Sequence, residues 1–239
     1  MDQVPPSKHD DEANAPTVVD AANDRVHAIT AAADALRAGG LVVLPTDTVY
    51  GLAADAFHQK GTARIFTAKQ RSRSLPLPVL VRSPKQLLGL CTDLPQAAER
   101  LMAAYWPGPL TLVVPAQPAM QWDLGRTEGT IGVRMPLDDI ALDVIRQVGP
   151  LAVTSANTSG SPAARTIDEA ISQLGDSVEV YVDGGPREGG AASTVVDLTR
   201  STATILRGGD LDEDDVAAVA EGTLDPLEAA ARWAERTAT

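Results

Sequence analysis

Residues 41–52 read Leu-Val-Val-Leu-Pro-Thr-Asp-Thr-Val-Tyr-Gly-Leu and join a short apolar run to a polar loop. The first four residues are all apolar and end at Pro45, which is typical of a strand buried on both faces. A helical pattern over residues 24–38 precedes this strand and stops at the glycine pair 39–40. A helix, a buried strand and a hydroxyl-rich loop therefore follow one another, which favours an α/β fold.

The same alternation of helices and strands continues toward the C-terminus. Further helices are expected from residue 83 onward and over 62–69, 95–105, 138–148 and 166–174. Further strands are expected over 78–82, 110–114, 130–134, 151–154, 178–182, 194–198 and 204–206. We therefore predict a single α/β domain over residues 23–210 around a twisted, mixed or mostly parallel sheet. It would lie between a disordered acidic tail at 1–22 and an acidic helical tail at 211–239.

The composition excludes several classes of protein. One cysteine and three histidines among 239 residues leave no disulfide framework and no Cys/His zinc site. No apolar stretch reaches the ~20 residues that span a bilayer, and the N-terminus lacks the pattern of a secretory signal. We therefore expect a cytoplasmic protein without membrane contact. Walker and Rossmann glycine loops and the Gly-x-Ser-x-Gly nucleophile elbow are also missing.

The net charge of −12 is unevenly distributed. Acidic residues concentrate in residues 1–24 and 210–239, whereas residues 25–209 carry no net charge. This distribution, with only 3% aromatic residues, argues for weak or no direct binding of nucleic acid. Residues 56–92 contain seven basic residues and no acidic one. That window is either a solvated basic face or a site for phosphate or carboxylate, and composition does not choose between them.

Polar segments stand at the ends of several apolar runs. Residues 45–52 follow the first strand, residues 154–160 follow the strand at 151–153, and Arg134 ends the strand at 130–134. Because ligands of open α/β sheets bind beyond strand ends, these groups could hold a small zwitterion beside a polyphosphate. Each also has a structural explanation, as a capped turn at Thr46, a local turn at Asn157 or an ion pair at Arg134.

Seven motifs stand in a characteristic order and spacing. They are Pro45-Thr-Asp-Thr-Val-Tyr-Gly-Leu52, Lys69-x-Arg71, Trp106-Pro-Gly-Pro-Leu-Thr111, Val133-Arg-Met-Pro136, Thr154-Ser-Ala-Asn157 with Ser159-Gly160, Ser193-Thr-Val-Val-Asp197 and Ile205-Leu-Arg207-x-Gly209. Together they closely resemble the YrdC-like family of threonylcarbamoyl-AMP synthases over about residues 24–210. The resemblance implies a short, single-domain member with an open, positively charged cavity.

The resemblance also implies an activity and its residues. The family makes L-threonylcarbamoyladenylate from L-threonine, bicarbonate and ATP and releases pyrophosphate, so a nucleotidyltransferase is expected. Mg²⁺ would accompany ATP, no protein metal site is implied, and a tRNA-modifying threonylcarbamoyl transferase complex would use the product at adenosine 37. By motif, threonine is assigned to Thr46, Arg134 and Thr154. ATP is assigned to Lys69, Arg71, Thr130, Ser155, Ala156, Asn157, Ser193, Thr194 and Arg207, and catalysis to Lys69 and Arg71.

Two positions depart from the family pattern, and two alternative functions remain open. Ser72 stands where many members have proline, and Leu75 stands where they have Asn or Lys. The first alternative is a non-catalytic RNA-binding module that uses the basic cavity. The second is a carbamoyl-transfer module of the kind found in hydrogenase maturation, although such modules belong to much longer chains.

Overall fold

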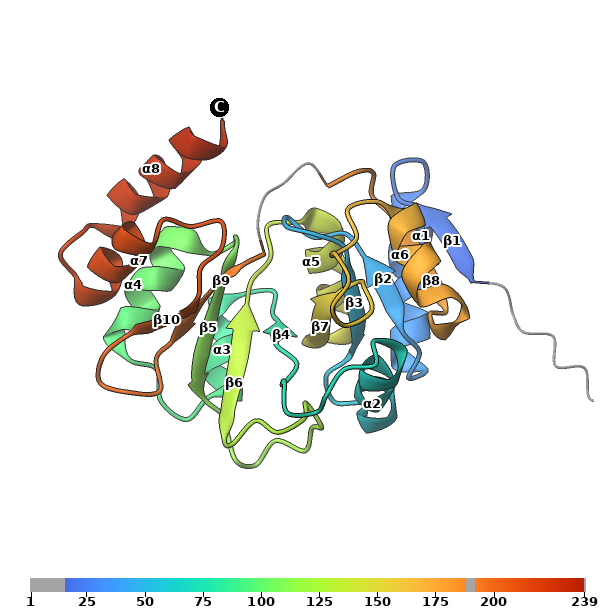
Figure 1. The fold of residues 1–239 in the computed structure, drawn as a ribbon, viewed down its shortest axis with the longest axis horizontal. Coiled ribbons are helices and arrows are strands. Elements are labelled where there is room, and N and C mark those ends of the chain that lie inside the picture. Colours follow the sequence, from blue (N-terminus) through green and yellow to red (C-terminus); the bar gives the residue numbers. More distant parts are fainter. Residues whose placement is uncertain (1–15, 188–191, 239) are drawn as a thin grey trace, which may run out of the picture.

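The computed structural model describes residues 16–187 and 192–238 (Figure 1). Its helices are α1 (Arg25–Arg37), α2 (Gln59–Ala68), α3 (Pro84–Leu90), α4 (Gln96–Tyr105), α5 (Asp139–Val148), α6 (Ile167–Leu174), α7 (Glu213–Glu221) and α8 (Pro226–Thr237). A 3-10 turn, η1 (Gly175–Ser177), follows α6. The strands are β1 (Thr17–Asp20), β2 (Val42–Leu44), β3 (Gly51–Asp55), β4 (Val79–Leu80), β5 (Leu110–Pro115), β6 (Thr130–Arg134), β7 (Leu151–Ser155), β8 (Val180–Asp183), β9 (Thr194–Asp197) and β10 (Thr204–Arg207).

The strands of the described residues form one sheet in the order β1-β8-β2-β3-β7-β4-β6-β5-β9-β10. Four neighbouring pairs run parallel and five run antiparallel. The predicted α/β fold with a mixed sheet is therefore confirmed, and the sheet is not mostly parallel. At one edge β10 carries a bulge, because Ile205 pairs with Val196 and Arg207 with Val195, which leaves Leu206 as the extra residue.

Two hydrophobic cores explain why β2 is apolar throughout. Val42 and Leu44 belong to a core that includes α1 and α5. Leu41 and Val43 belong to a larger core that includes α2, α4 and α6. Since successive side chains of a strand point to opposite faces, both faces of β2 are covered, as the run at 41–44 predicts.

Two strands were not anticipated from the sequence. Residues 17–20 form β1, which pairs in parallel with β8. The disordered tail predicted for residues 1–22 is therefore wrong for 17–20, while residues 1–15 lie outside the described residues. Gly51 to Asp55 form β3, a central strand between β2 and β7. A Cβ at Gly51 would lie 2.7 Å from Val153 Cγ1, so the close approach of these strands requires glycine there.

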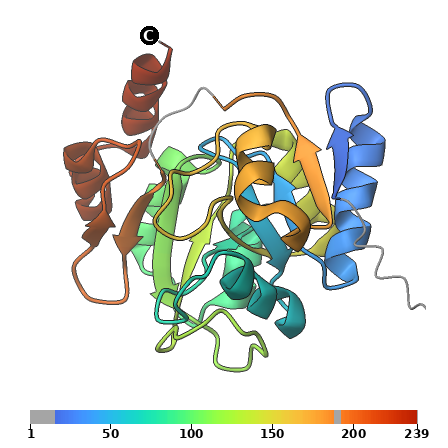
Figure 2. The same ribbon diagram turned by 45° about the vertical axis from the view of Figure 1, so that its right-hand side comes forward.

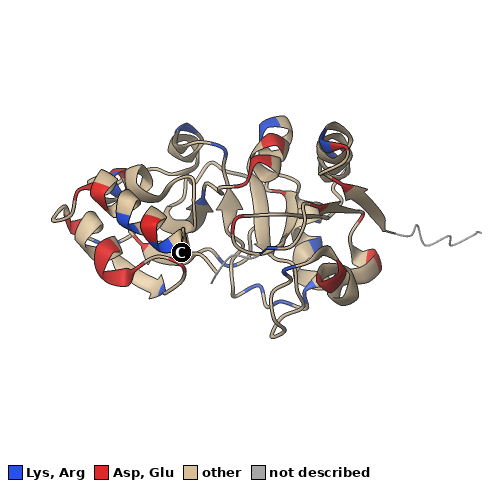
Figure 3. Cartoon of the chain, turned by 90° about the horizontal axis from the view of Figure 1, so that it is seen from above, with Lys and Arg blue, Asp and Glu red and all other residues tan. Residues whose placement is uncertain are grey.

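The acidic C-terminal segment is helical, as predicted, but it is not a detached tail. In Figures 1 and 2, α7 and α8 lie beside α4 at one end of the molecule. Leu211, Val216, Val219, Leu224 and Ala229 belong to the larger core. Figure 3 shows acidic residues gathered on the helices at this end. Within the described residues, every helix is too short or too polar to cross a membrane.

Candidate functional site

A cavity of about 450 Å³ lies against β5, β6 and β9 and reaches the ends of β7 and β10. Eight of the twelve residues assigned to substrates by motif line this cavity. They are Thr46, Arg71, Thr130, Arg134, Thr154, Ser155, Ser193 and Arg207. These residues come from six separate stretches of the chain. The fold therefore brings distant segments together at one cleft, as we expected from the sequence.

Strand alternation decides which side chains reach the cavity. Along β5, Leu110 and Leu112 enter the core, whereas Thr111 and Val113 line the cavity. The same rule separates Ser193 from Thr194. Ser193 lines the cavity, whereas Thr194 is fully buried and its hydroxyl accepts a hydrogen bond from the Leu211 amide at 3.2 Å. The ATP assignment of Thr194 therefore does not fit this geometry.

The bulge in β10 brings Arg207 to the cavity. Arg207 pairs with Val195, which lines the cavity, whereas Ile205 pairs with Val196, which lies in the core. If β10 paired with β9 without a bulge, Leu206 would stand opposite Val195, and Arg207 would stand opposite Thr194, whose side chain faces the core. Arg207 donates hydrogen bonds to the Ser193 carbonyl from Nε at 3.1 Å and from Nη2 at 2.7 Å. The guanidinium is thereby fixed at the cavity wall.

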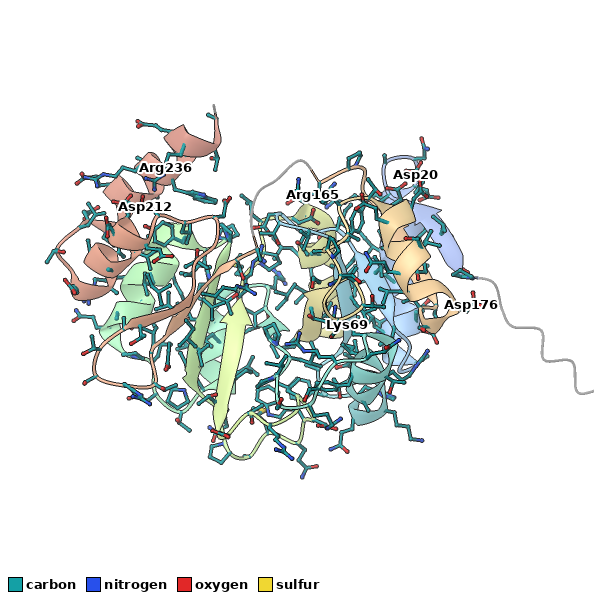
Figure 4. The ribbon with its side chains drawn as sticks, viewed as in Figure 1. Asp20, Lys69, Arg165, Asp176, Asp212 and Arg236 are labelled. Carbon is teal, nitrogen blue, oxygen red and sulfur yellow. The ribbon has the colours of Figure 1, made fainter. Side chains whose placement is uncertain are left out.

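Lys69 and Arg71 leave α2 in different directions. Lys69 is the C-terminal cap of α2, and Gln70 follows with a φ of 51°, in the left-handed region. The Arg71 amide then donates to the Phe66 carbonyl at 2.9 Å and closes the turn. This reversal turns Lys69 inward, near the centre of the molecule (Figure 4), and directs Arg71 to the cavity.

Lys69 is 1% exposed and binds the last residue of β7 and the segment that follows it. Its ammonium donates to the Ser155 carbonyl at 2.5 Å, to the Asn157 carbonyl, and to Asn157 Oδ1 at 2.9 Å. Ser155 Oγ donates to the same Oδ1 at 2.5 Å. Because an ammonium has three hydrogens, these partners account for every donor of Lys69. Lys69 and Asn157 thus stand behind the cavity wall, and Ser155 forms part of it.

The positive charges of the site lie close enough to affect one another. Burial lowers the pKa of Lys69 to about 8, with a further contribution from the charge of Arg71. Burial and the charge of Arg207 lower the pKa of Arg71, and burial and the charge of Arg134 lower that of Arg207. Among the described residues no carboxylate forms a salt bridge with Lys69, Arg71 or Arg207. The wall therefore carries uncompensated positive charge, which suits a polyanion.

Arg134 differs from these cations because it is neutralised. Its Nη2 donates to Asp47 Oδ1 at 2.6 Å, its Nη1 to Thr48 Oγ1 at 3.1 Å, and its Nε to the Gly108 carbonyl at 3.0 Å. Both side chains of the Arg134–Asp47 pair are about nine-tenths buried. The structural ion pair left open by the sequence is therefore present. Two of the five guanidinium hydrogens remain for a ligand.

Two further assignments meet competing contacts in this geometry. The Ala156 amide donates to the Tyr50 carbonyl at 2.8 Å, and Ala156 does not line the cavity. Thr46 lines the cavity, but its hydroxyl donates to the Val49 carbonyl at 2.6 Å and accepts from the Thr48 amide at 3.2 Å. Thr46 therefore caps its own turn and forms part of the cavity wall at the same time.

Sequence reasoning missed several residues around the site. Thr48, Thr111 and Thr127 line the cavity. Arg187 lies behind the wall, where Nη1 pairs with Asp138 Oδ2 at 3.1 Å and the guanidinium lies 5.7 Å from the Tyr50 ring centroid. Burial raises the pKa of Asp138, against the opposing effects of the Ala141 amide and Arg187. Thr48 stands inside a quoted motif, whereas nothing in the local sequence distinguishes Arg187.

The basic window at residues 56–92 does not form one surface. Arg64 pairs with Glu179 at 2.6 Å, and Arg73 pairs with Asp123 and lies 4.7 Å from the centroid of the Phe66 ring. Arg71 instead lines the cavity, and Lys69 is buried behind the cavity wall. Leu75, which departs from the family pattern, is 55% exposed and does not line the cavity. Arg64 and Arg73 of this window therefore form ion pairs away from the cavity, while Arg71 lines it, and an anion site at Arg71 stays a prediction.

The arrangement defines an α/β protein whose sheet carries an open cleft lined by Arg71 and Arg207 and by the charge-neutralised Arg134. A family model for the Sua5/YciO/YrdC domain, described as "Telomere recombination", matches residues 34–209. The chain belongs to this family.

Relatives extend the comparison over most of the chain. A Mycobacterium tuberculosis protein, provisionally named as a threonylcarbamoyl-AMP synthase, is 48% identical over 195 residues, or 82% of this chain and 90% of the relative. The Sua5 structure of Pyrococcus abyssi, described as complexed with L-threonine, has a TM-score of 0.78 and 38% identity. That match covers 85% of this chain but 60% of the P. abyssi chain. The structure of Escherichia coli YciO has a TM-score of 0.72 and 26% identity, covering 81% and 94% of the two chains.

Proposed function

We propose that this protein is an L-threonylcarbamoyladenylate synthase that condenses L-threonine, bicarbonate and ATP. One observation carries the proposal most directly. Arg71 and Arg207, with Lys69 behind them, supply positive charge that no acidic side chain of the described residues pairs with. The cavity that they line also contains a charge-neutralised arginine and several hydroxyls. Such a cavity has one part suited to a triphosphate and another suited to a zwitterion. The names of the relatives in the same family support this reading.

L-Threonine would bind near Arg134, Thr46 and Thr154. The two unused guanidinium hydrogens of Arg134 would bind its carboxylate. Because Asp47 already neutralises Arg134, the site would favour a molecule without net charge over a simple anion. The hydroxyls of Thr46 and Thr154 would contact the amine or side chain, and the L-threonine in the P. abyssi Sua5 structure makes this amino acid the first to test.

ATP would place its phosphates at Arg71, Arg207, Ser155 and Ser193. Mg²⁺ would enter with the nucleotide, because the described residues contain no cluster of His, Cys, Asp or Glu suited to a metal ion. Lys69 would hold the Ser155–Asn157 segment in place and contribute its charge from behind the wall. Thr130, whose hydroxyl donates to the Thr127 carbonyl at 2.8 Å, would complete the nucleotide side.

The reaction needs no protein nucleophile. The threonine amine and bicarbonate would form an N-carboxylate and release water. An oxygen of the N-carboxylate would then attack the α-phosphorus, and the bond from that phosphorus to the bridging oxygen would break, so that pyrophosphate leaves with the electron pair. Negative charge grows on the departing phosphates, and the fixed cations Arg71 and Arg207 would stabilise it.

The product is a reactive mixed anhydride and needs an acceptor. We expect a threonylcarbamoyl transferase that modifies adenosine 37 of tRNA to use it, in the cytoplasm. Both the transferase partner and this location stay predictions. No observation on the described residues favours the RNA-binding alternative.

A single assay tests the proposed function. Purified protein is mixed with ATP, Mg²⁺, L-threonine and bicarbonate, and pyrophosphate and the adenylate are measured by coupled assay and mass spectrometry. We expect pyrophosphate release that depends on both threonine and bicarbonate. Serine in place of threonine tests the amino-acid site, and glycerol in its place is the negative control. Pyrophosphate release that is independent of threonine would contradict the proposal.

A further inference from the structure

The C-terminal helix α8 contacts the substrate side of the molecule through one aromatic side chain. Trp233 lies on α8, beyond residues 34–209 that the family model matches. Its ring packs edge-on against Tyr105 of α4, with 6.5 Å between the ring centroids and an interplanar angle of 77°. Trp233 is partly buried against the larger core. The indole is therefore held in a defined orientation by its packing.

The far edge of this indole meets Gly108. A Cβ at Gly108 would lie 3.0 Å from Cη2 and 3.4 Å from Cζ3 of Trp233, and 2.7 Å from the Tyr105 carbonyl oxygen. No side chain fits between these groups, so the glycine backbone itself rests against the indole. The loop that follows α4 is thus enclosed between its own helix and α8.

Gly108 is also the backbone contact of Arg134. Its amide donates to the Met135 carbonyl at 2.9 Å, and its carbonyl accepts from Arg134 Nε at 3.0 Å. The first bond fixes the loop to the end of β6, and the second fixes the plane of the guanidinium. Since Nη1 and Nη2 bind Thr48 and Asp47, Gly108 supplies the one Nε contact of the cavity arginine.

We propose that Trp233 is a positioning residue for Arg134: its indole supports Gly108, and Gly108 in turn fixes the guanidinium that binds the amino-acid substrate. This inference rests on the proposed function. It gives the α7–α8 segment a role in threonine binding, although neither helix contributes a residue to the cavity wall. A displacement of the loop by about 1 Å would break a 3.0 Å hydrogen bond and misplace the carboxylate of the substrate.

The test uses Trp233→Phe and Trp233→Ala in the full-length protein. The Cη2 and Cζ3 atoms that reach Gly108 belong to the distal ring of the indole, so phenylalanine keeps an aromatic ring beside Tyr105 but shortens the reach. We expect the KM for L-threonine to rise about tenfold in Trp233→Ala and by less in Trp233→Phe, with the KM for ATP within twofold of wild type. Leu227→Ala, at a 76% exposed position on the same helix, is the matched control and leaves both KM values unchanged.

A merely structural role gives a different pattern. Loss of folded protein lowers kcat and leaves both KM values unchanged, and a general loosening raises both KM values together; either pattern overturns the inference. If Trp233→Ala does not fold, the Phe variant decides by the same criterion. Wild-type protein that forms no adenylate overturns the proposed function, whereas a fully active wild type with an unchanged threonine KM in the folded variants overturns only the role of Trp233.

Discussion

The substitution Arg71→Met separates the binding function of the site from its stability. In the free protein Arg71 lies near Lys69 and Arg207 and has no acidic partner among the described residues. Its side-chain hydrogen bonds go from Nε to the Leu75 carbonyl at 3.0 Å and from Nη2 to the Pro76 carbonyl at 3.3 Å. Methionine fills a similar volume without the charge.

The expected loss of affinity follows from Coulomb's law. A guanidinium about 4 Å from a phosphate charge contributes about 4 kcal/mol at an effective dielectric constant of about 20. Screening and competition with water reduce this value, so we expect the Kd for Mg-ATP to rise about 10²–10³-fold. Two exposed hydrogen bonds worth about 1 kcal/mol each are lost, while repulsion from Lys69 and Arg207 is relieved. The melting temperature of the free protein should therefore change by less than about 4 °C.

The assay pairs calorimetric titration of Mg-ATP with thermal unfolding of the free protein. Arg73→Met is the matched control, because Arg73 has the same charge two residues away but pairs with Asp123 outside the cavity. That exposed pair is worth about 1 kcal/mol or less, so the control should bind ATP within twofold of wild type. A Kd for Arg71→Met within threefold of wild type, or equal losses in the two variants, would refute the assignment of Arg71 to the phosphates.

Three further predictions concern the charges and caps described above. The pKa of Lys69 is lowered to about 8, so its side chain is about half protonated at pH 8, and a bound triphosphate raises that pKa. Calorimetry of ATP binding in buffers of different ionisation enthalpy should therefore detect uptake of up to about 0.5 proton at pH 8 and little at pH 6.5. The affinity for ATP should fall as the pH rises past 8, because Lys69 loses its charge. Asp47→Ala should lower the free energy of unfolding by about 3–5 kcal/mol in urea titrations, since it leaves Arg134 buried without its partner; a loss below about 1 kcal/mol would show that the pair is solvated. Asp225→Ala removes the side-chain cap that accepts from the Leu227 and Glu228 amides and should cost about 1 kcal/mol in the same assay, whereas Asp225→Ser should restore most of it.

Much of the fold could be predicted because the informative signals are local. The apolar run at 41–44, the capping box beginning at Thr166 and the alternation along residues 130–134 all formed the elements that these patterns indicate. The strand β3 was not predicted because Gly51-Leu-Ala-Ala-Asp55 is rich in residues of low strand propensity. Its stability comes from burial between two neighbouring strands, which a local pattern does not reveal. The strand β1 was not predicted because it depends on pairing with β8, which lies about 160 residues away in the chain and leaves no local signal.

The candidate site was predictable as a set of residues but not as a set of contacts. Motif spacing brought Lys69, Ser155 and Asn157 together, and the structure joins them by hydrogen bonds. What spacing could not show is that every ammonium hydrogen of Lys69 is already used. The neutralisation of Arg134 by Asp47 was equally hidden, because a pair separated by 87 positions leaves no periodic signal.

The bulge that turns Arg207 toward the cavity has a second consequence, for solubility. β10 lies at the edge of the sheet, and a regular edge strand presents unpaired amides and carbonyls to other chains. An extra residue breaks the even spacing of those groups, so a second molecule cannot add a strand in register. Deleting Leu206 would restore regular pairing with Arg207 still opposite Val195, so we expect the deletion to promote self-association while the cation stays at the cleft. The bulge in β10 thus opposes the addition of strands from other molecules at this edge, and it also places Arg207 at the cavity.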